Sequence, residues 1–547
     1  MEKRFFLALL LAAAVVAITQ ILFPVTRPGP VTRSKNDTVS TSEPKGRSIA
    51  DVNQRLTVVQ PTSDSASTAA SAAMPELTTL ETSKSIYRFS DIGTAPVSVT
   101  LRNYKNLAPS GGAVELGVPG QSLLRYALVV NGDTTRFDGI PFRSRVSTNQ
   151  VIYDAIVANH NVEISYEIQP DKYVVTVNGK VEGADQNTYL LIQLPTSLKP
   201  AESDTVSDLR NLAFSFKPER ENARIVRFGS LDPGEQRLEA GPLVWAAVKN
   251  KYFVLGLLNP SGSTFNEVAL KGGPRTSKVA TTASATIVKS LKTGSFAFDL
   301  YAGPQQSTEL IAMGRDFDHV NPYGWRFLQG VVQPIAALCI RLLLWMHQVL
   351  RLSYGWVLII FGILIRVALW PLNQSAMRSS MKMQEIQPRL AEVQKKYKDK
   401  PEKQREEIMK VYRDAGASPF TALTGCLPAL IPMPVLFALF FVFQNTIEFR
   451  GVPFMWLHDI SIKDPLYILP VLMGISMYVL SWIGLRNAPP NPQAKTMSYM
   501  FPVMMTFILA NLASGLNLYY TAQNLAAIPQ QWLLAQERAR RKTPSRQ

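Results

Sequence analysis

One arginine stands inside an apolar run that is long enough to enter a membrane. The stretch GILIRVALWP begins at Gly362, and the run from Trp356 to Trp370 holds Arg366 as its only charged residue. A charge in such a place is costly unless water, a counter-charge or hydrogen bonds satisfy it. A guanidinium there can attract carboxylates, so transient binding of acidic groups is the chemistry we expect. The alternative is that this long side chain reaches the nearby headgroups.

A second polar feature lies in the last apolar segment of the chain. Four of its side chains recur at positions i, i+3, i+4 and i+7 of a helix, and Gln531 extends the row: Asn517, Tyr520, Thr521 and Asn524. Such a stripe avoids lipid and faces the interior of a helical bundle. Together with Arg366 it predicts a hydrated cavity within the membrane. Hydrogen bonding between helices alone is the alternative.

Apolar segments of membrane length must position these residues. A span needs about 20 residues, and six segments approach that length: Phe5–Phe23, Tyr354–Trp370, Leu423–Phe443, Leu466–Leu485, Met497–Leu512 and Leu516–Leu534. The first is longer than the apolar part of a usual signal peptide, so we interpret it as an uncleaved anchor. The last two are joined by Ala513-Ser514-Gly515, which predicts a tight helical hairpin. The third contains Pro428, Pro432 and Pro434, which predict an irregular helix.

Positive charges indicate the orientation of these spans. The loop 373–422 and the tail 535–547 each carry an excess of four positive charges, and Arg486 and Lys495 flank another connection. Six spans with both termini in the cytoplasm place all three regions on the cytoplasmic side. The segment Phe327–Leu350 is apolar but contains Pro334, Arg341 and His347. We therefore expect an amphipathic helix on the outer membrane surface rather than another span.

The sequence of the region outside the membrane predicts a tether followed by an all-β domain. Residues 24–78 are rich in Ser, Thr, Pro and Ala and cannot bury much apolar surface. From about residue 80 the sequence alternates with period two, as in Val162–Ile168. Hairpins are expected at Asn131-Gly132, at Asn178-Gly179 and at Lys249-Asn250-Lys251. An antiparallel sandwich, more a scaffold than a binding surface, is the predicted fold.

The sequence pattern of the cytoplasmic loop 372–422 predicts a charged helical hairpin. An apolar stripe precedes Asp399-Lys400-Pro401, and a second apolar side follows in the helix that Pro401 is placed to begin. The stripe consists of Ile386, Leu390, Val393 and Tyr397, and the second side of Ile408, Val411 and Tyr412. The loop is either a docking site for a partner or anionic lipid or a solvated connection.

The chain lacks the residues that several classes of protein require. The chain has 547 residues, two cysteines in separate apolar segments and four histidines without ligand spacing, so we expect no metal site and no disulfide framework. It contains neither GxxxxGK[ST] nor GxSxG. We therefore expect no enzyme activity and no cofactor. The net charge of +16 indicates membrane orientation and contact with anionic lipid more than specific nucleic-acid binding.

These motifs together resemble the YidC family of membrane protein insertases. The resemblance covers about residues 350–535 and rests on five clustered spans, the arginine in the first of these, the helical loop, Gly425-Cys426-Leu427-Pro428, Met433-Pro434 and the GLNLYY start of the last span. The extra first span and the large outside domain resemble the Gram-negative branch. Family members often have Gln where this chain has Pro432.

The resemblance implies a function and a set of roles. It implies insertion and folding of proteins in the bacterial inner membrane, alone or with the Sec translocon, through a polar groove around Arg366. Met433 and Pro434 match the family's substrate-sliding face, and Tyr520 matches its tyrosine on the last span. The outside domain would be a periplasmic β-supersandwich. Nascent membrane proteins would be substrates, and ribosomes would deliver them through the loop and tail.

The predicted architecture is a membrane α-helical bundle of six spans, five of them forming the core, plus this all-β domain. Two other functions stay open: a small-anion transporter or channel with Arg366 as its binding cation, and an assembly factor that acts through the outside domain. The expected divisions are an anchor 1–23, a tether 24–78, a β-domain 79–320, an interfacial helix 321–353, a span 354–371, a loop 372–422, four spans in 423–534 and a basic tail 535–547.

Overall fold

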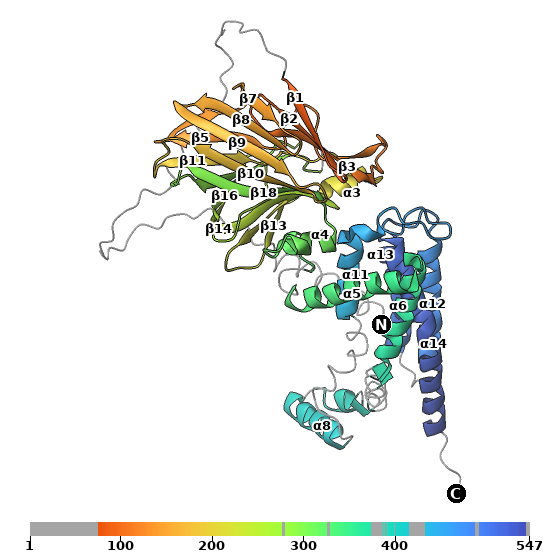
Figure 1. The fold of residues 1–547 in the computed structure, drawn as a ribbon. Helices are drawn as coiled ribbons and strands as arrows, with labels where there is room; N and C mark the ends of the chain where they lie inside the picture. Colours follow the sequence, from red (N-terminus) through yellow and green to blue (C-terminus); the bar gives the residue numbers. More distant parts are fainter. Residues whose placement is uncertain are drawn as a thin grey trace, which may run out of the picture. The chain divides into compact units, whose positions relative to one another are not determined.

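The computed structural model describes residues 75–275, 279–324, 329–371, 373–374, 386, 389–390, 392–398, 400–414, 433–486 and 492–542. Strands occupy the first part of this range and helices the second (Figure 1). The predicted span Phe5–Phe23 and almost all of the predicted tether lie outside the described residues. So do Cys426, Pro428 and Pro432 of the third predicted span.

Within the described residues, eighteen strands form the β-domain, and all of their pairs are antiparallel, as predicted. One sheet has the order β1-β2-β3-β4, and the other has the order β6-β5-β11-β17-β16-β14-β15-β18-β10-β9-β8-β7, with β12 and β13 joined to β14. The bounds are β1 Leu77–Glu81, β2 Ser85–Ser90, β3 Pro96–Lys105, β4 Ala113–Glu115, β5 Arg125–Val130, β6 Asp133–Arg136, β7 Arg143–Val146, β8 Gln150–Val157, β9 His160–Ile168, β10 Val174–Val181, β11 Thr188–Gln193, β12 Ala213–Pro218, β13 Arg224–Arg227, β14 Gln236–Lys249, β15 Phe253–Leu258, β16 Phe265–Gly272, β17 Ala283–Ser290 and β18 Ser295–Pro304.

Alternation in the sequence corresponds to burial in these strands. In β9, the side chains of Val162, Ile164, Tyr166 and Ile168 are buried while their neighbours are partly or fully exposed. The hairpin at Asn131-Gly132 is confirmed, because β5 and β6 pair across it and both turn residues have positive φ. A hairpin is also present at Lys249-Asn250-Lys251, but its connection is shifted by one residue: Lys249 ends β14, and residues 250–252 join it to β15. These local patterns were therefore sufficient to locate both turns.

The hairpin predicted at Asn178-Gly179 is wrong. Strand β10 continues through both residues to Val181 and pairs with β9 on one side and β18 on the other. Gly179 lies opposite Phe296, and a Cβ on this glycine would come within 2.1 Å of the Phe296 ring. The glycine therefore makes room for an aromatic ring from the neighbouring strand and does not form a turn.

The helical region begins at Gln329. Its helices are α5 Gln329–Leu350, α6 Tyr354–Ala368, α8 Pro401–Asp414, α11 Met433–Asn445, α12 Ile468–Leu485, α13 Pro492–Leu509 and α14 Ser514–Lys542. Short helices accompany the β-domain and one loop: α3 Thr205–Arg210, α4 Ser307–Ala312, η1 Phe228–Ser230, η2 Phe317–Val320 and η3 Ile447–Phe449. Helix α14 continues about two turns beyond the predicted last span and includes much of the basic tail.

Two helices in the described part of the chain, α5 and α12, are long and apolar enough to cross a membrane by length and composition. Helix α6 and residues 435–445 of α11 are apolar but shorter. The predicted number of six spans is therefore not confirmed by helix length and hydropathy. Helix α5, which was expected to lie on the membrane surface, is one of the two.

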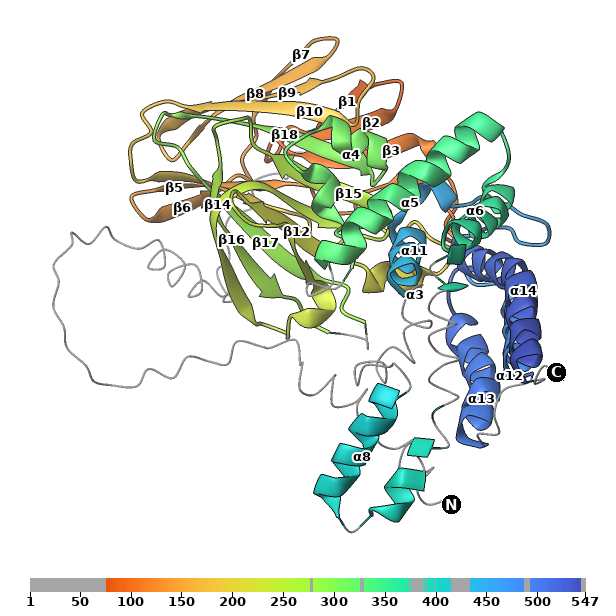
Figure 2. The same ribbon diagram turned by 90° about the horizontal axis from the view of Figure 1, so that it is seen from below.

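The two halves of the cytoplasmic loop contact each other through their apolar sides. Ile386 and Leu390 form one buried cluster with Tyr412 of α8, and Ile408 and Val411 pack against it. Pro401 is the first residue of α8, as predicted. Figure 2 shows α8 beside the short helical turns that precede it.

A buried ion pair connects the β-domain to the loop after α11. Arg450 Nε lies 2.7 Å from Glu202 Oε1, and only 5% of each side chain is exposed. The Arg450 Nη2 atom also donates to the Ala201 carbonyl at 2.9 Å, and Ile447 belongs to the buried core of the β-domain. This loop is therefore packed into the β-domain as part of its core.

Lys249 is a buried cation at the β14–β15 turn. Its side chain is 5% exposed, and its Nζ donates to the Asn250 carbonyl at 3.4 Å. Loss of hydration lowers the pKa of Lys249 to about 7. The unfolded chain therefore binds more protons than the folded chain between about pH 7 and pH 10.5. Stability should rise with pH through this window and be lost as the pH falls.

We predict that Lys249→Met stabilises the protein at pH 7 by about 1–3 kcal/mol, because an apolar side chain carries no such hydration cost. The variant should also lose most of the rise in stability between pH 7 and pH 10. Denaturant unfolding of the full chain followed by tryptophan fluorescence measures both effects. A wild-type pH profile retained by the variant would contradict this assignment.

Candidate functional site

The guanidinium of Arg366 is held by one amide of α14. Its Nη2 atom donates to Gln530 Oε1 at 2.8 Å, and Gln530 Nε2 donates in turn to the Trp370 carbonyl at 3.0 Å. Gln530 is 1% exposed. Arg366 lies in the last turn of α6, where the partial negative charge of the helix end stabilises a cation. One glutamine therefore orients the arginine and satisfies a carbonyl beyond the end of α6.

This amide leaves the guanidinium incompletely satisfied. The Arg366 Nε atom is buried and has no hydrogen-bond partner. No carboxylate of the described residues forms an ion pair with Arg366. Gln530 is neutral, so it offers a hydrogen bond without cancelling the charge. The positive charge of Arg366 is thus available to an anion that can approach it.

Close contact between α6 and α14 holds these groups together. A Cβ on Gly362 would lie 3.0 Å from the Tyr519 carbonyl oxygen and 3.4 Å from the Ala522 Cβ. The rings of Phe361 and Tyr519 lie 5.9 Å apart between centroids. Figure 1 shows the two helices in the helical region, and these contacts establish that they pack directly. The small residue at position 362 permits this approach.

The predicted polar stripe of α14 is divided among different neighbours. Asn524 Nδ2 donates to Ser476 Oγ of α12 at 3.0 Å. Thr521 Oγ1 donates to the Asn517 carbonyl of its own helix at 2.8 Å. Across the described part of the chain, none of these side chains hydrogen-bonds to Arg366. The hydrogen bonds of the stripe therefore run between helices at Asn524 and within α14 at Thr521.

Asn517 has a structural position at the α13–α14 hairpin. Its side chain is fully buried, and Nδ2 donates to the Leu509 carbonyl, the last residue of α13, at 3.0 Å. Its Oδ1 atom is buried without a hydrogen-bond partner. The bond to Leu509 satisfies a carbonyl that the end of α13 leaves free. Asn517 therefore fixes the turn between α13 and α14. This turn spans residues 510–513 and not Ala513-Ser514-Gly515 as predicted, because Ser514 and Gly515 already belong to α14.

The remaining predicted site residues lie elsewhere on the helices. Tyr520 is partly buried, and its ring contacts that of Tyr519 edge-on at 5.3 Å. Met433 and Pro434 are the first residues of α11. Their side chains are outside the described part of the structure. Their contact with a substrate stays a prediction.

Gln530 was not predicted to be a site residue, whereas its neighbour Gln531 was placed on the polar stripe. Gln531 lies against α12, where a Cβ on Gly484 would come within 2.4 Å of Gln531 Nε2. Gln523 and Gln530 lie seven residues apart, and this spacing is a signal in the sequence that could have identified the correct residue. Both side chains are buried in the structure. Residues at this spacing share a helix face. The adjacent glutamines thus face different helices.

This arrangement suits electrostatic binding and positioning. A fixed cation with spare donors can accept a carboxylate, whereas the described residues contain no cluster of three or more His, Cys, Asp or Glu that could hold a metal ion. The surrounding helices are apolar, which strengthens any interaction between charges. The fold and this site define a membrane protein with a helical region and a β-rich domain.

Comparisons with known proteins identify the family. Residues 89–338 match the model described as YidC periplasmic domain, and residues 345–542 match the one described as 60Kd inner membrane protein. The membrane protein insertase YidC of Chlorobaculum tepidum is 31% identical over 424 residues, covering 73% of this chain and 69% of the relative. That of Chlorobium phaeovibrioides is 32% identical over 400 residues, covering 69% and 67%. The chain belongs to the YidC family of membrane protein insertases.

One solved structure, an active YidC insertase with its first transmembrane domain resolved, covers 84% of this chain and 93% of its own at 18% identity, with a TM-score of 0.33. Membership confirms the resemblance seen in the sequence. A β-rich periplasmic domain and a helical C-terminal region in the bacterial inner membrane follow from it. Nascent membrane proteins are accordingly the class of substrate.

Proposed function

We propose that this chain inserts and helps to fold membrane proteins through a hydrophilic groove around Arg366. The observation that carries this proposal is the state of the guanidinium, which has a neutral amide partner, a buried Nε without a partner and no carboxylate among the described residues. A charge left in this state seeks an anion. Acidic residues in the polar tail of an incoming protein supply such anions.

We propose six spans with both termini in the cytoplasm. In this topology residues 24–353 lie in the periplasm, and the hairpin in 372–422 and the basic end of the chain lie in the cytoplasm. The excess of positive charge in these two regions supports the orientation. The insertion site then opens toward the side on which new proteins are made.

Helix α5 lies on the outer membrane surface in this proposal and does not span. Apart from Leu350 at its end, the exposed large apolar side chains of α5 form one narrow stripe: Val331, Leu338, Leu342, Trp345 and Val349. Another face is buried within the helical region: Val332, Ala336, Cys339, Leu343 and Met346. A narrow apolar stripe beside buried and polar faces suits a helix that lies in the interface plane. Helix α5 is also long and apolar enough to cross a membrane, so its surface position rests on the difference between its faces.

The mechanism follows from the cost of moving polar groups through hydrocarbon. The hydrocarbon layer is about 30 Å thick, and a polar tail must cross it. Water around Arg366 shortens the dry distance, and the guanidinium stabilises acidic side chains during transfer. The apolar helix of the substrate then leaves sideways into lipid, and its burial there drives the step.

Other predicted residues have roles along this path. Met433, Pro434 and Tyr520 contact the departing helix, because α11 and α14 flank its exit. Asn517, Thr521 and Asn524 supply polar atoms along α14, and the bond from Asn524 to Ser476 of α12 supports this role. The Sec translocon, the ribosome and membrane lipids are the partners in this scheme, with ribosome contact through the cytoplasmic hairpin and the basic end of α14.

We predict that Arg366→Ala lowers insertion of substrates with short acidic tails by about tenfold or more, since a hydrogen bond to a charged group contributes about 1.5–3 kcal/mol. Arg366→Lys should retain most of the activity, because it keeps the charge. Insertion into proteoliposomes that contain the purified full chain measures both variants. Equal insertion by the Ala variant and the unaltered chain would reject the proposal.

Gln530→Glu tests the role of the Arg366 charge by neutralising it and leaving the arginine in place. The new carboxylate would lie where an oxygen already accepts from Arg366 at 2.8 Å, and it would occupy the guanidinium permanently. We predict a loss of insertion similar to that of Arg366→Ala. Gln531→Glu is the matched control, because it adds the same charge to the adjacent residue, which faces α12. If both glutamate variants insert equally well, Arg366 does not bind acidic tails.

A further inference from the structure

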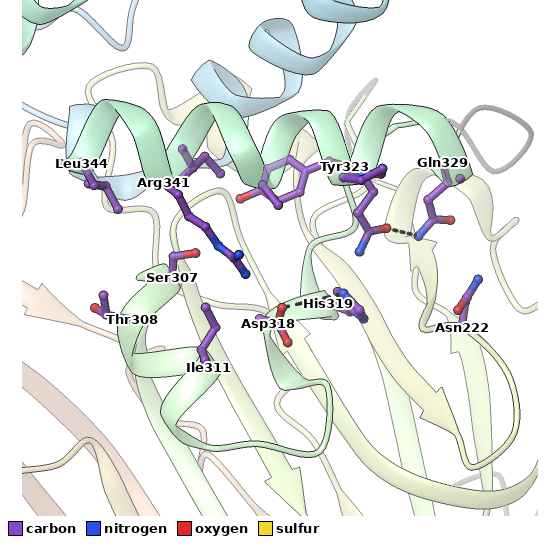
Figure 3. Close-up of a pocket in the computed structure, with 15 residues that line it drawn as sticks. Asn222, Ser307, Thr308, Ile311, Asp318, His319, Tyr323, Gln329, Arg341 and Leu344 are labelled. Atoms are coloured by element: carbon purple, nitrogen blue, oxygen red, sulfur yellow. Dashed lines mark hydrogen bonds and ion pairs between the residues drawn. The ribbon is translucent and has the colours of Figure 1, made fainter. Parts of the chain in front are cut away.

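A cavity lies between α5 and the end of the β-domain. Its volume is about 430 Å³, and Figure 3 shows its walls. One wall is α5, and the opposite wall consists of α4 and the 3-10 helix η2. Arg341 of α5 points across the cavity toward Asp318 of η2 (Figure 3). The cavity therefore has a cationic wall and an anionic wall.

The two charges in this cavity are not paired with each other. Arg341 has neither a hydrogen bond nor an ion pair within the described ranges of the chain. Asp318 has one ion-pair neighbour, His319 Nε2, at 3.7 Å, and its side chain is 37% exposed. Both groups are thus open to a ligand that carries a negative and a positive charge.

The cavity also has an apolar surface next to these charges. Pro334, Ala337, Ile340 and Leu344 of α5 line it, together with Ile311 of α4. On the α5 helix, Arg341 lies between this lining and the exposed stripe that includes Leu338 and Trp345. If that stripe contacts lipid, the cavity opens at the level of the headgroups.

We propose that this cavity binds the headgroup of phosphatidylethanolamine from the outer leaflet. Arg341 receives the phosphate, Asp318 receives the ammonium, and the apolar wall of α5 covers the start of the acyl chains. A zwitterion matches the two opposite charges, whereas phosphatidylglycerol brings only the anion. The inference rests on the surface position proposed for α5. It assigns a bound lipid to the β-domain side of that helix.

The test is lipid retention by the purified full chain. The protein is equilibrated with mixed micelles of equal phosphatidylethanolamine and phosphatidylglycerol, and native mass spectrometry measures the lipid that stays bound. We expect a preference for phosphatidylethanolamine. Arg341→Gln should lower retention of both lipids by about tenfold, and Asp318→Asn should remove only the preference. Arg351→Gln is the control, since Arg351 is an exposed cation just after α5 and outside the cavity.

Equal retention of the two lipids by the unaltered chain would overturn the proposal. A preference that survives in both cavity variants, or a peptide found in place of lipid, would also overturn it. The assay contains no insertion substrate, so it is independent of the groove around Arg366. The Arg366→Ala protein should retain lipid like the unaltered chain, which separates failure of one proposal from failure of the other.

Discussion

The hydrogen bond from Arg366 to Gln530 is the interaction on which the helical region depends. The N–H donors of an arginine in an apolar bundle need hydrogen-bond acceptors, and an apolar residue at position 530 would provide none. Gln530 Oε1 accepts a hydrogen bond from one of these donors, and Gln530 Nε2 donates a hydrogen bond to the Trp370 carbonyl. A carboxylate at the same position would satisfy the arginine better but would cancel its charge. The neutral amide keeps the cation in place and leaves it attractive to anions.

The packing of α14 follows from the same requirement. Gly362 lets α6 approach Tyr519 and Ala522 closely, which brings position 530 within reach of position 366. On the other side, Asn524 and Gln531 contact α12, and Asn517 fixes the turn from α13. Helix α14 is therefore held by polar contacts along its length on two sides. Such contacts suit a helix that borders a hydrated path, since its polar groups avoid lipid.

The sequence was informative wherever a local pattern determined the structure. Period-two alternation located β9, Asn131-Gly132 located a turn, and Pro401 located the start of α8. The sequence was misleading at Asn178-Gly179. Gly179 makes room for the ring of Phe296, and this residue belongs to a strand more than a hundred residues away in the sequence. Local turn chemistry and tertiary packing favour the same dipeptide for different reasons, and the sequence alone does not distinguish them.

The candidate site shows the same division. Arg366 was recognisable because its charge contrasts with its apolar surroundings. Its partner was not, because Gln530 and Gln531 are chemically identical and their directions depend on how α14 is rotated against α6 and α12. The roles of Met433, Pro434 and Tyr520 stay predictions, since they concern a substrate.

Access of water to position 366 tests the account most directly. Arg366→Cys and Leu364→Cys can be compared in a chain whose native Cys339 and Cys426 are replaced by serine, using a charged, membrane-impermeant thiol reagent on inverted inner-membrane vesicles. Leu364 is 52% exposed on α6 and should face lipid. A hydrated groove predicts rapid modification of the Arg366→Cys protein and none of the Leu364→Cys protein. If both proteins resist the reagent, no water reaches the arginine, and the groove does not exist.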